Sequence, residues 1–389
     1  MELAKYKLGD IVTLLNGRAY LMPELQDSGK YRILRVGNLS GGNDSWYYSD
    51  MELDENKYCE NGDLLYAWAC NFGPHIWKEE KVIYHYHIWK LVENKEKVDR
   101  SYLYYYLLHQ TPFYLGGVNG ATMVHITKKN MEKKTVYIPR SLAVQHRIAS
   151  ILSTYDTLIE NNTKRIRLLE KMAENLYKEW FVRFRFPGHE KVEMESGLPK
   201  GWKQVSLFEV AKVMYGFAFK SNRFCDNAEL NPVVRIRDIQ DNHTNTYTDE
   251  PCDEKYLINK NAILIGMDGI FHMCLWNGER AYLNQRVVML NSKNEYFCNY
   301  LLFMAIRPQI KYWEQVISGT TVAHLGDKHL RRVKVLLPDS KTIKIANRVV
   351  AQIMDEKNFL QHQNSLLARQ RDLLLPRLMS GKLEVKVKP

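Results

Sequence analysis

Polar side chains that could bind a nucleic acid occur in two matching sets along this chain, within segments whose glycine and asparagine content predicts loops. In these sets, Arg35 and Asn38 correspond to Arg235 and Asp238. Arginine, asparagine, aspartate and threonine side chains can read base edges, whereas lysine and backbone amides hold phosphates. The candidate contact residues of the first set are Arg18, Tyr20, Arg35, Asn38, Thr122 and His125, and those of the second are Phe219, Lys220, Arg235, Asp238, Thr321 and His324.

Two glycines, Gly17 and Gly216, begin the first loop of each set. A small residue lets a backbone approach a groove closely, which favours a binding role. Turn chemistry explains these glycines equally well, because glycine readily adopts a positive φ. Turn chemistry explains the arginines less well, so the sets as a whole favour binding.

The spacing between the two sets is nearly constant. NGATMVHI at 119–126 and SGTTVAHL at 318–325 place Gly120 and Gly319 199 residues apart. The same offset relates LLNGRAY to VMYGFAF, GDLLYAW to NAILIGM and HIWKL to RVVML, while YRILRVGNL and NPVVRIRDI differ by 200. Such a long period indicates duplicated domains and not a solenoid. We therefore expect both copies to use these loops in the same way, on a target with two halves.

Each copy is predicted to be an α+β domain. Short alternating runs such as YKLGDIVTLLNG and KVIYHYHIWKL, broken by Gly, Asn and Asp, predict a twisted and largely antiparallel sheet. Short helices are expected over 101–110 and 298–306, each followed by the repeated octapeptide and an apolar run.

Two long helices are predicted from apolar residues that recur in steps of four and three, the spacing of a helix packed on a partner helix. We expect helices of roughly 35 residues, about 50 Å long. Neither would be stable with its apolar stripe exposed, so we expect the two to pack antiparallel as a coiled coil. The seam residues that we single out as candidate interface positions are Leu152, Ile159, Ile166, Leu169, Leu360, Leu367 and Leu374.

Polar residues interrupt these seams at Asn162, Lys357, Asn364 and Arg371. Buried polar seam residues can fix register and orientation at a cost in stability. Alternatively, their side chains reach solvent at the edge of an imperfect seam. The sequence favours neither interpretation.

The expected architecture is two globular domains separated by the helix pair, in a dumbbell with pseudo-twofold symmetry. The predicted segments are a first globular domain (1–144), a first long helix (145–186), a linker (187–202), a second globular domain (203–343), and a second long helix with a C-terminal tail (344–389).

Composition agrees with a folded protein that binds polyanions. The 389 residues carry a formal net charge of +11, and 45% of them are hydrophobic. Six cysteines lack any C-x-x-C pair, which favours reduced thiols in a cytoplasmic protein over a disulfide framework or a zinc site. Residues 1–10 lack a signal-peptide apolar segment, and no run approaches roughly 18 apolar residues, so we expect no membrane association.

No motif for catalysis is evident, and no catalytic or metal-ligating residue is predicted. Phosphate-binding, dinucleotide-binding, nucleophile-elbow and zinc-protease patterns are missing from the sequence. His85 and His87 could ligate a metal from one strand face, but no third ligand is evident and a structural role is favoured. PDSK at 338–341 faintly resembles a nuclease signature, but it lies at a helix entrance and its counterpart PRSL lacks the charges.

The segment LAVQHRIASILSTYDTLIENNTKRIRLLEKMAENLYKEWFVRFRFPG at 142–188 resembles the central spacer helix of specificity subunits of type I restriction–modification enzymes. GLPKGW at 197–202 and LLLPRLMSGKLEV at 373–385 resemble later segments of these subunits, while KNFLQHQNSLLARQRD at 357–372 is less similar. The resemblance covers essentially the whole chain.

The resemblance implies two target recognition domains that each read one half of a split double-stranded DNA site. It also implies that the helices dock two modification subunits, which carry S-adenosylmethionine and methylate adenine, and that restriction subunits join this core. The chain itself would hold no cofactor, with S-adenosylmethionine, ATP and Mg on the partners. Two alternatives remain: a self-contained methylation or restriction enzyme, and a coiled-coil scaffold without DNA function.

Overall fold

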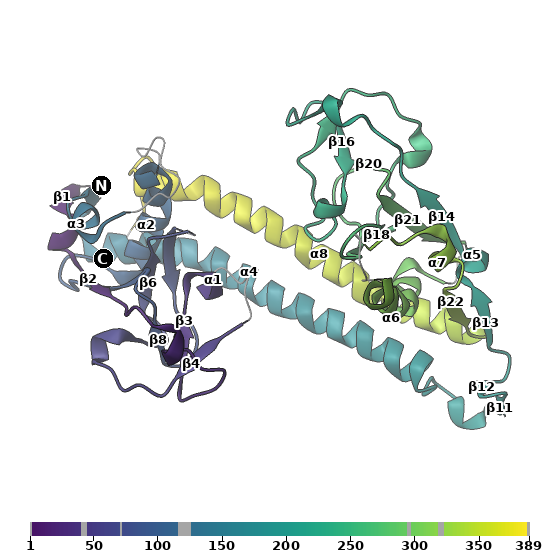
Figure 1. Cartoon of the computed structure of the whole chain (residues 1–389). Coiled ribbons are helices and arrows are strands. Elements are labelled where there is room, and N and C mark those ends of the chain that lie inside the picture. The colour runs from purple at the N-terminus through teal and green to yellow at the C-terminus, as the bar shows by residue number, and fades with distance from the viewer. Residues whose placement is uncertain are drawn as a thin grey trace. The chain divides into compact units, whose positions relative to one another are not determined.

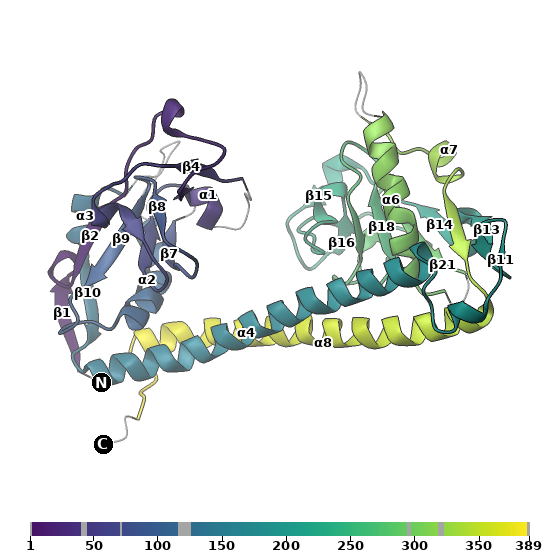
Figure 2. The same cartoon turned by 90° about the horizontal axis from the view of Figure 1, so that it is seen from below.

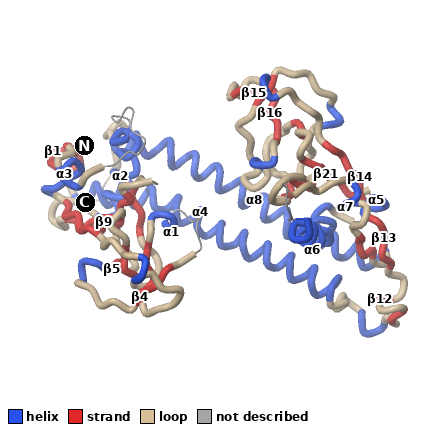
Figure 3. Tube along the Cα trace, in the orientation of Figure 1, coloured by secondary structure: helices blue, strands red, loops and turns tan. Residues whose placement is uncertain are grey.

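The computed structural model describes residues 2–39, 45–70, 72–115, 126–293, 297–317 and 323–386 (Figure 1). The chain divides into two compact units. Unit 1 comprises Met1–Thr163 and His362–Pro389, and unit 2 comprises Lys164–Gln361. Each unit holds one globular domain and parts of two long helices, α4 (Leu142–Tyr177) and α8 (Ser340–Met379). Figure 3 distinguishes the strands from the helices in both units.

The first domain combines three small sheets with helices, in the strand orders β2-β9-β6-β7, β4-β3-β8-β5 and β1-β10. Its strands are β1 (Leu3–Lys7), β2 (Val12–Asn16), β3 (Tyr31–Leu34), β4 (Tyr47–Ser49), β5 (Tyr58–Cys59), β6 (Leu64–Ala67), β7 (Gly73–Ile76), β8 (Val82–Tyr84), β9 (Ile88–Glu93) and β10 (Thr135–Pro139). Its α-helices are α1 (Val36–Leu39), α2 (Arg100–Leu115) and α3 (Lys128–Glu132).

The second domain repeats two of these orders, as β14-β21-β18-β19 and β13-β22, while its third sheet has the order β15-β17-β16-β20, with the outer strand β15 beside β17 and β20 at the opposite edge. Its strands are β13 (Lys203–Ser206), β14 (Ala211–Tyr215), β15 (Phe224–Cys225), β16 (Asn231–Val234), β17 (Tyr247–Thr248), β18 (Ile263–Gly266), β19 (Met273–Leu275), β20 (Tyr282–Leu283), β21 (Val287–Ser292) and β22 (Lys334–Leu337). Its helices are α5 (Leu207–Val210), α6 (Asn299–Ile317) and α7 (Asp327–Leu330), and a hairpin of β11 (Met194–Glu195) and β12 (Leu198–Pro199) precedes it.

Strand register confirms the duplication. In the first domain Val12 pairs with Glu93, and in the second Ala211 pairs with Ser292, each position shifted by 199 residues. The same shift relates the β6–β9 and β6–β7 pairs to the β18–β21 and β18–β19 pairs. The described strand pairs are antiparallel, as the alternation predicts, apart from β3–β8 and β16–β20.

The ends of the long helices close the core of each domain. In unit 1, Ile148 and Leu152 of α4 and Leu378 of α8 are buried against Tyr66 and Trp89 of the sheet. In unit 2, α6 lies against the sheet (Figure 2). Leu301 of α6 and Val350 of α8 belong to the same buried cluster. Burying these apolar faces is the main favourable contribution to the stability of each unit.

The two long helices confirm the expected lengths, with 36 residues in α4 and 40 in α8. Asp339 accepts hydrogen bonds from the backbone N–H groups of Lys341 and Thr342 at the start of α8, so PDSK is a helix cap. Every seam position lies buried or half-buried, including the spacer candidates Leu152, Ile159, Ile166, Leu169, Leu360, Leu367 and Leu374. Exposed apolar side chains lie next to several of them, at Leu158, Leu168, Leu366 and Leu373.

The polar seam residues in unit 1 pair between the helices. Asn162, which is 6% exposed, donates through Nδ2 to Asn364 Oδ1 at 3.0 Å and to Gln363 Oε1 at 2.8 Å. Arg371 is ion-paired with Asp156 across the same helix pair. These contacts favour register-fixing over a solvent-reaching role, because each polar group meets a partner on the other helix. The earlier residue of α4, Asp156, pairs with the later residue of α8, Arg371, whereas Asn162 pairs with Asn364. The two helices are therefore antiparallel within unit 1.

Replacing Asn162 alone by leucine is expected to lower the free energy of unfolding by about 2 kcal/mol, because the amide of Asn364 then loses its buried donor. The double variant Asn162→Leu with Asn364→Leu should regain most of this loss, since both polar partners are replaced by apolar groups. Urea unfolding followed by far-ultraviolet circular dichroism measures both effects. A double variant no more stable than the single one would contradict the register-fixing role.

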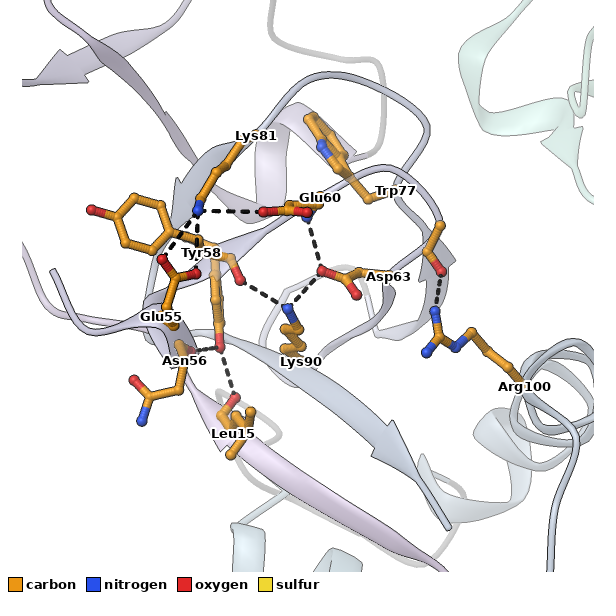
Figure 4. A network of polar contacts seen from close by, with 12 residues as sticks. Leu15, Glu55, Asn56, Tyr58, Glu60, Asp63, Trp77, Lys81, Lys90 and Arg100 are labelled. Atoms are coloured by element: carbon orange, nitrogen blue, oxygen red, sulfur yellow. Dashed lines mark hydrogen bonds and ion pairs between the residues drawn. The ribbon is translucent and has the colours of Figure 1, made fainter. Parts of the chain in front are cut away.

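A polar network links the strands of the first domain (Figure 4). Lys90 of β9 lies 2.7 Å from Asp63 and donates to the carbonyl of Tyr58 at 3.1 Å, and both charged side chains are less than one-fifth exposed. The second domain has Met289 and Ala262 at the positions 199 residues later, and both are buried. One copy of the fold therefore holds an ion pair where the other holds an apolar contact.

Asp63→Ala is expected to destabilise the first domain by about 3 kcal/mol, since it leaves Lys90 partly buried without its carboxylate. Adding Lys90→Met, which copies the apolar pair of the second domain, should restore most of the stability. Thermal unfolding of the single and double variants tests this expectation. It fails if the double variant is the less stable of the two.

Candidate nucleic-acid interface

One scaffold of backbone hydrogen bonds holds the same three loops together in both domains. In the first domain the N–H groups of Arg18, Trp68 and His85 donate to the carbonyls of Tyr84, His87 and Leu34. In the second domain the corresponding donors are Phe217, Met267 and Asn284, and the acceptors are Leu283, Arg286 and Val234. Both scaffolds bring together the loop after the first long strand, the loop after β6 or β18, and the turn before β9 or β21.

Gly17 and Gly216 make this arrangement possible. A Cβ atom on Gly17 would lie 2.4 Å from the carbonyl oxygens of Tyr84 and His85, and one on Gly216 would lie 2.0 Å from the carbonyl oxygen of Asn284. Neither glycine has a positive φ, so the explanation from turn geometry is wrong. Close approach is the reason for both glycines, but the approaching group is the protein's own backbone.

The first domain's loop cluster is rich in aromatic rings. Trp68, Tyr86 and His87 lie with ring centroids 4.0 to 6.0 Å apart, and His85 lies 4.8 Å from His87. Burial, together with the neighbouring His87 and Arg35, lowers the pKa of His85 to about 4, so its ring is neutral at pH 7. Aromatic rings and a neutral imidazole are suited to contacts with bases more than with phosphates.

Arg18 and Tyr20, two of the candidate contact residues, make close contacts within this domain. The Arg18 guanidinium forms a two-pronged ion pair with Glu24, at 2.7 and 2.9 Å. Arg18 also lies 5.2 Å from the centroid of the Tyr20 ring. Tyr20 is half-buried beside His85, and burial raises the pKa of its hydroxyl. The ion pair between Arg18 and Glu24 must break before the terminal nitrogens of Arg18 can donate two hydrogen bonds to a base.

Asn38 and Asp238 occupy the same position in the two domains. Asn38 Oδ1 accepts from the backbone N–H of Arg35 at 3.1 Å, and Asp238 Oδ2 accepts from that of Arg235 at 2.9 Å. This contact fixes the turn that follows β3 or β16, which gives both side chains a structural role. The guanidinium of Arg35 lies over the Tyr47 ring.

Two candidates in the second domain, Phe219 and Lys220, lie in the segment that connects β14 to β15. Phe219 is 7% exposed and packs among aromatic rings, with Phe217 at 4.9 Å, so little of its ring is available to DNA. Lys220 donates its backbone N–H to Glu250 at 2.9 Å and is exposed. Arg235 lies over the ring of Phe224 at 5.4 Å.

The second domain's loop cluster is cationic. Arg235, Arg237 and Arg286 line one cleft of about 470 Å³ with Asp268 and His272, among other residues. His324 lies beside it, with Nδ1 2.6 Å from Asp268 Oδ1. Guanidinium groups around a cleft are suited to phosphates and to the acceptor edge of guanine.

Several residues of these clusters were absent from the candidates chosen by sequence, namely Trp68, His85, Tyr86, His87, Arg237, Asp268, His272, Asn284 and Arg286. A signal for some of them is visible in the repeat, because HIWKL and RVVML begin with His87 and Arg286 at equivalent positions. Both residues directly precede a buried strand, where a polar side chain falls in a turn at the sheet edge.

Three candidates, Thr122, His125 and Thr321, lie outside the described residues, as does most of each repeated octapeptide. Their role as DNA contacts stays a prediction. Over the part of the chain that the structure covers, no group of three or more His, Cys, Asp or Glu side chains could hold a metal ion. His85 and His87 instead contact aromatic rings.

Two copies of one loop scaffold define this chain as a protein with a duplicated binding domain. Residues 2–171 and 199–369 both match the type I restriction modification DNA specificity domain, and the chain belongs to this family.

Individual relatives agree with this assignment. The chain is 30% identical over 186 residues to the type I restriction enzyme EcoBI specificity subunit of Escherichia coli, in an alignment that covers 47% of this chain and 39% of that protein. It is 24% identical over 401 residues to the MjaVIII specificity subunit of Methanocaldococcus jannaschii, covering 98% of this chain and 92% of the relative.

A solved structure shows the same fold. The crystal structure of the type I restriction–modification system S subunit from M. genitalium matches with a TM-score of 0.63 at 16% sequence identity, covering 97% of this chain and 96% of that one. Among the described helices, none is both long enough and apolar enough to cross a membrane.

Proposed function

We propose that this chain recognises a bipartite DNA target, with each domain reading one half-site through its loop cluster. The observation that carries this proposal is that one backbone scaffold occurs twice with different side chains on it. Aromatic rings and a neutral His85 occupy the cluster in the first domain, and arginines occupy it in the second. A repeated scaffold with different side chains is what two readers of different base sequences need.

The long helices are proposed to act as the spacer between the two readers. Helices of 36 and 40 residues are about 54 and 60 Å long at 1.5 Å per residue. After allowing for their overlap with the domains, an antiparallel coiled coil of this length suits half-sites about one turn of B-DNA apart, roughly 34–36 Å. This arrangement is the dumbbell expected from the duplication.

Catalysis is proposed to belong to partner subunits. Two modification subunits with S-adenosylmethionine would methylate adenine, and restriction subunits with ATP and Mg would cleave DNA, as in the family. Seam residues such as Leu152 and Leu360 are buried within the chain, so docking falls to exposed apolar neighbours such as Leu158, Leu168 and Leu366. Apolar side chains exposed along a helix are suited to such an interface.

The decisive experiment maps methylated adenines in host DNA with and without this gene. A split motif that disappears with the gene supports the proposal. The purified chain alone should neither bind S-adenosylmethionine nor cut DNA, and either activity would favour a self-contained enzyme. Binding without any sequence preference would favour a scaffold.

Arg235→Ala is expected to weaken specific binding by about 1–3 kcal/mol if the side chain contacts a base, and to relax specificity in one half-site only. Arg35→Ala should do the same in the other half-site. Competition binding against a panel of half-site substitutions measures the effect. An equal loss on random DNA would make these residues phosphate contacts.

A further inference from the structure

The arginines in the cleft of the second domain differ in how much of each guanidinium remains available. Arg237 donates to Thr246 Oγ1 at 3.0 Å and lies 3.6 Å from Asp238. Arg286 approaches Asp268 most closely through Nε, at 3.3 Å, and its side chain is about half exposed. Among the described residues, the guanidinium of Arg286 donates no hydrogen bond. Its N–H groups are therefore accessible to a ligand.

Asp268, which lies beside the Arg286 guanidinium, is itself held in place. One carboxylate oxygen faces Arg286, and the other lies 2.6 Å from Nδ1 of His324. The backbone around it is paired on both sides, because Gly269 donates to the carbonyl of Ala323 and Met267 donates to that of Arg286. A side chain oriented by a second layer of contacts binds its ligand with less loss of conformational entropy.

The surroundings favour a base over a phosphate as the ligand. The carboxylate of Asp268 would repel a charged phosphate brought next to it more strongly than an uncharged base edge. Ile270, which is 60% exposed, lines the same cleft and offers an apolar contact of the kind made with a thymine methyl group. An arginine fork pairs with O6 and N7 of guanine in the major groove.

We propose that Arg286 reads a guanine in the half-site of the second domain, and that Asp268 and His324 act as positioning residues for it. This inference rests on the proposed DNA recognition by that domain. The first domain lacks this arginine–aspartate pair, because His87 and Ala69 occupy the positions equivalent to Arg286 and Asp268. The guanine contact therefore belongs to one half-site only.

The test determines the methylated motif in cells that express the full chain together with the modification and restriction genes of its own system. Variants Arg286→Ala, Asp268→Asn and His324→Ala are compared with Arg280→Ala, an exposed arginine of the same domain outside the cleft. We expect one guanine position of one half-site to become degenerate in Arg286→Ala. The same position should lose part of its selectivity in the two positioning variants, with no change in Arg280→Ala.

Binding of the wild-type complex to DNA carrying 7-deazaguanine provides a second measurement that does not depend on how the variants fold. Removing N7 at the read guanine should weaken binding roughly 10-fold. The proposal is overturned if no guanine of that half-site depends on N7, or if Arg286→Ala lowers methylation uniformly without changing the motif. Failure of the proposed function looks different, because the wild-type chain would then direct no split motif at all.

Discussion

Replacing Gly216 by alanine is expected to destabilise the second domain by on the order of 4 kcal/mol and to abolish reading of its half-site. The added Cβ would lie 2.0 Å from the carbonyl oxygen and 2.3 Å from the carbonyl carbon of Asn284. These are backbone atoms of the turn that carries Arg286, and they cannot rotate away as a side chain would. The clash must therefore separate the loop after β14 from the turn between β20 and β21.

The matched control is Gly326→Ala. The Cβ added there would have the His324 side chain as its nearest neighbour, at 3.6 Å, an ordinary van der Waals contact. Urea unfolding gives the change in stability, and competition binding shows which half-site is affected. Equal stability of the Gly216 and Gly326 variants, or loss of the first half-site in Gly216→Ala, would contradict the role assigned to this close approach.

Inserting one turn of four residues into both long helices is expected to lengthen the gap between the half-sites while leaving both half-sites unchanged. The insertions fall after Thr163 in α4 and after Gln361 in α8, where the two units divide. Four residues add about 6 Å and rotate the following segment by about 40°. Because a base pair rises about 3.4 Å, the unread gap should grow by at most about two base pairs.

The methylated motif before and after insertion measures this effect, and the original motif should be lost almost completely. Substituting four exposed residues at the same places without changing helix length is the control, and it should leave the motif unchanged. A motif with altered bases and an unaltered gap would show that the helices do not set the spacing.

The sequence alone determined the features that depend on local pattern and repeated spacing. The offset of 199 residues predicted the duplication, and the strand registers confirm it. Steps of four and three predicted two helices of about the right length, because helix periodicity is a property of neighbouring residues. The same pattern identified Asn162 and Asn364 as polar seam positions but left their role open. Their hydrogen bonds favour register-fixing.

Only the tertiary structure decided which side chains meet in the loop clusters. Asp268 and His324 are 56 residues apart in sequence, and nothing in their local pattern predicts a contact of 2.6 Å. The two-pronged bond from Arg18 to Glu24 and the burial of Phe219 likewise depend on how loops fold back on the sheet. Gly216 shows the difference most directly. The sequence predicted that this glycine lies in a loop. The atom that excludes a Cβ is the carbonyl oxygen of Asn284, which only folding brings to 2.0 Å from the position of that Cβ.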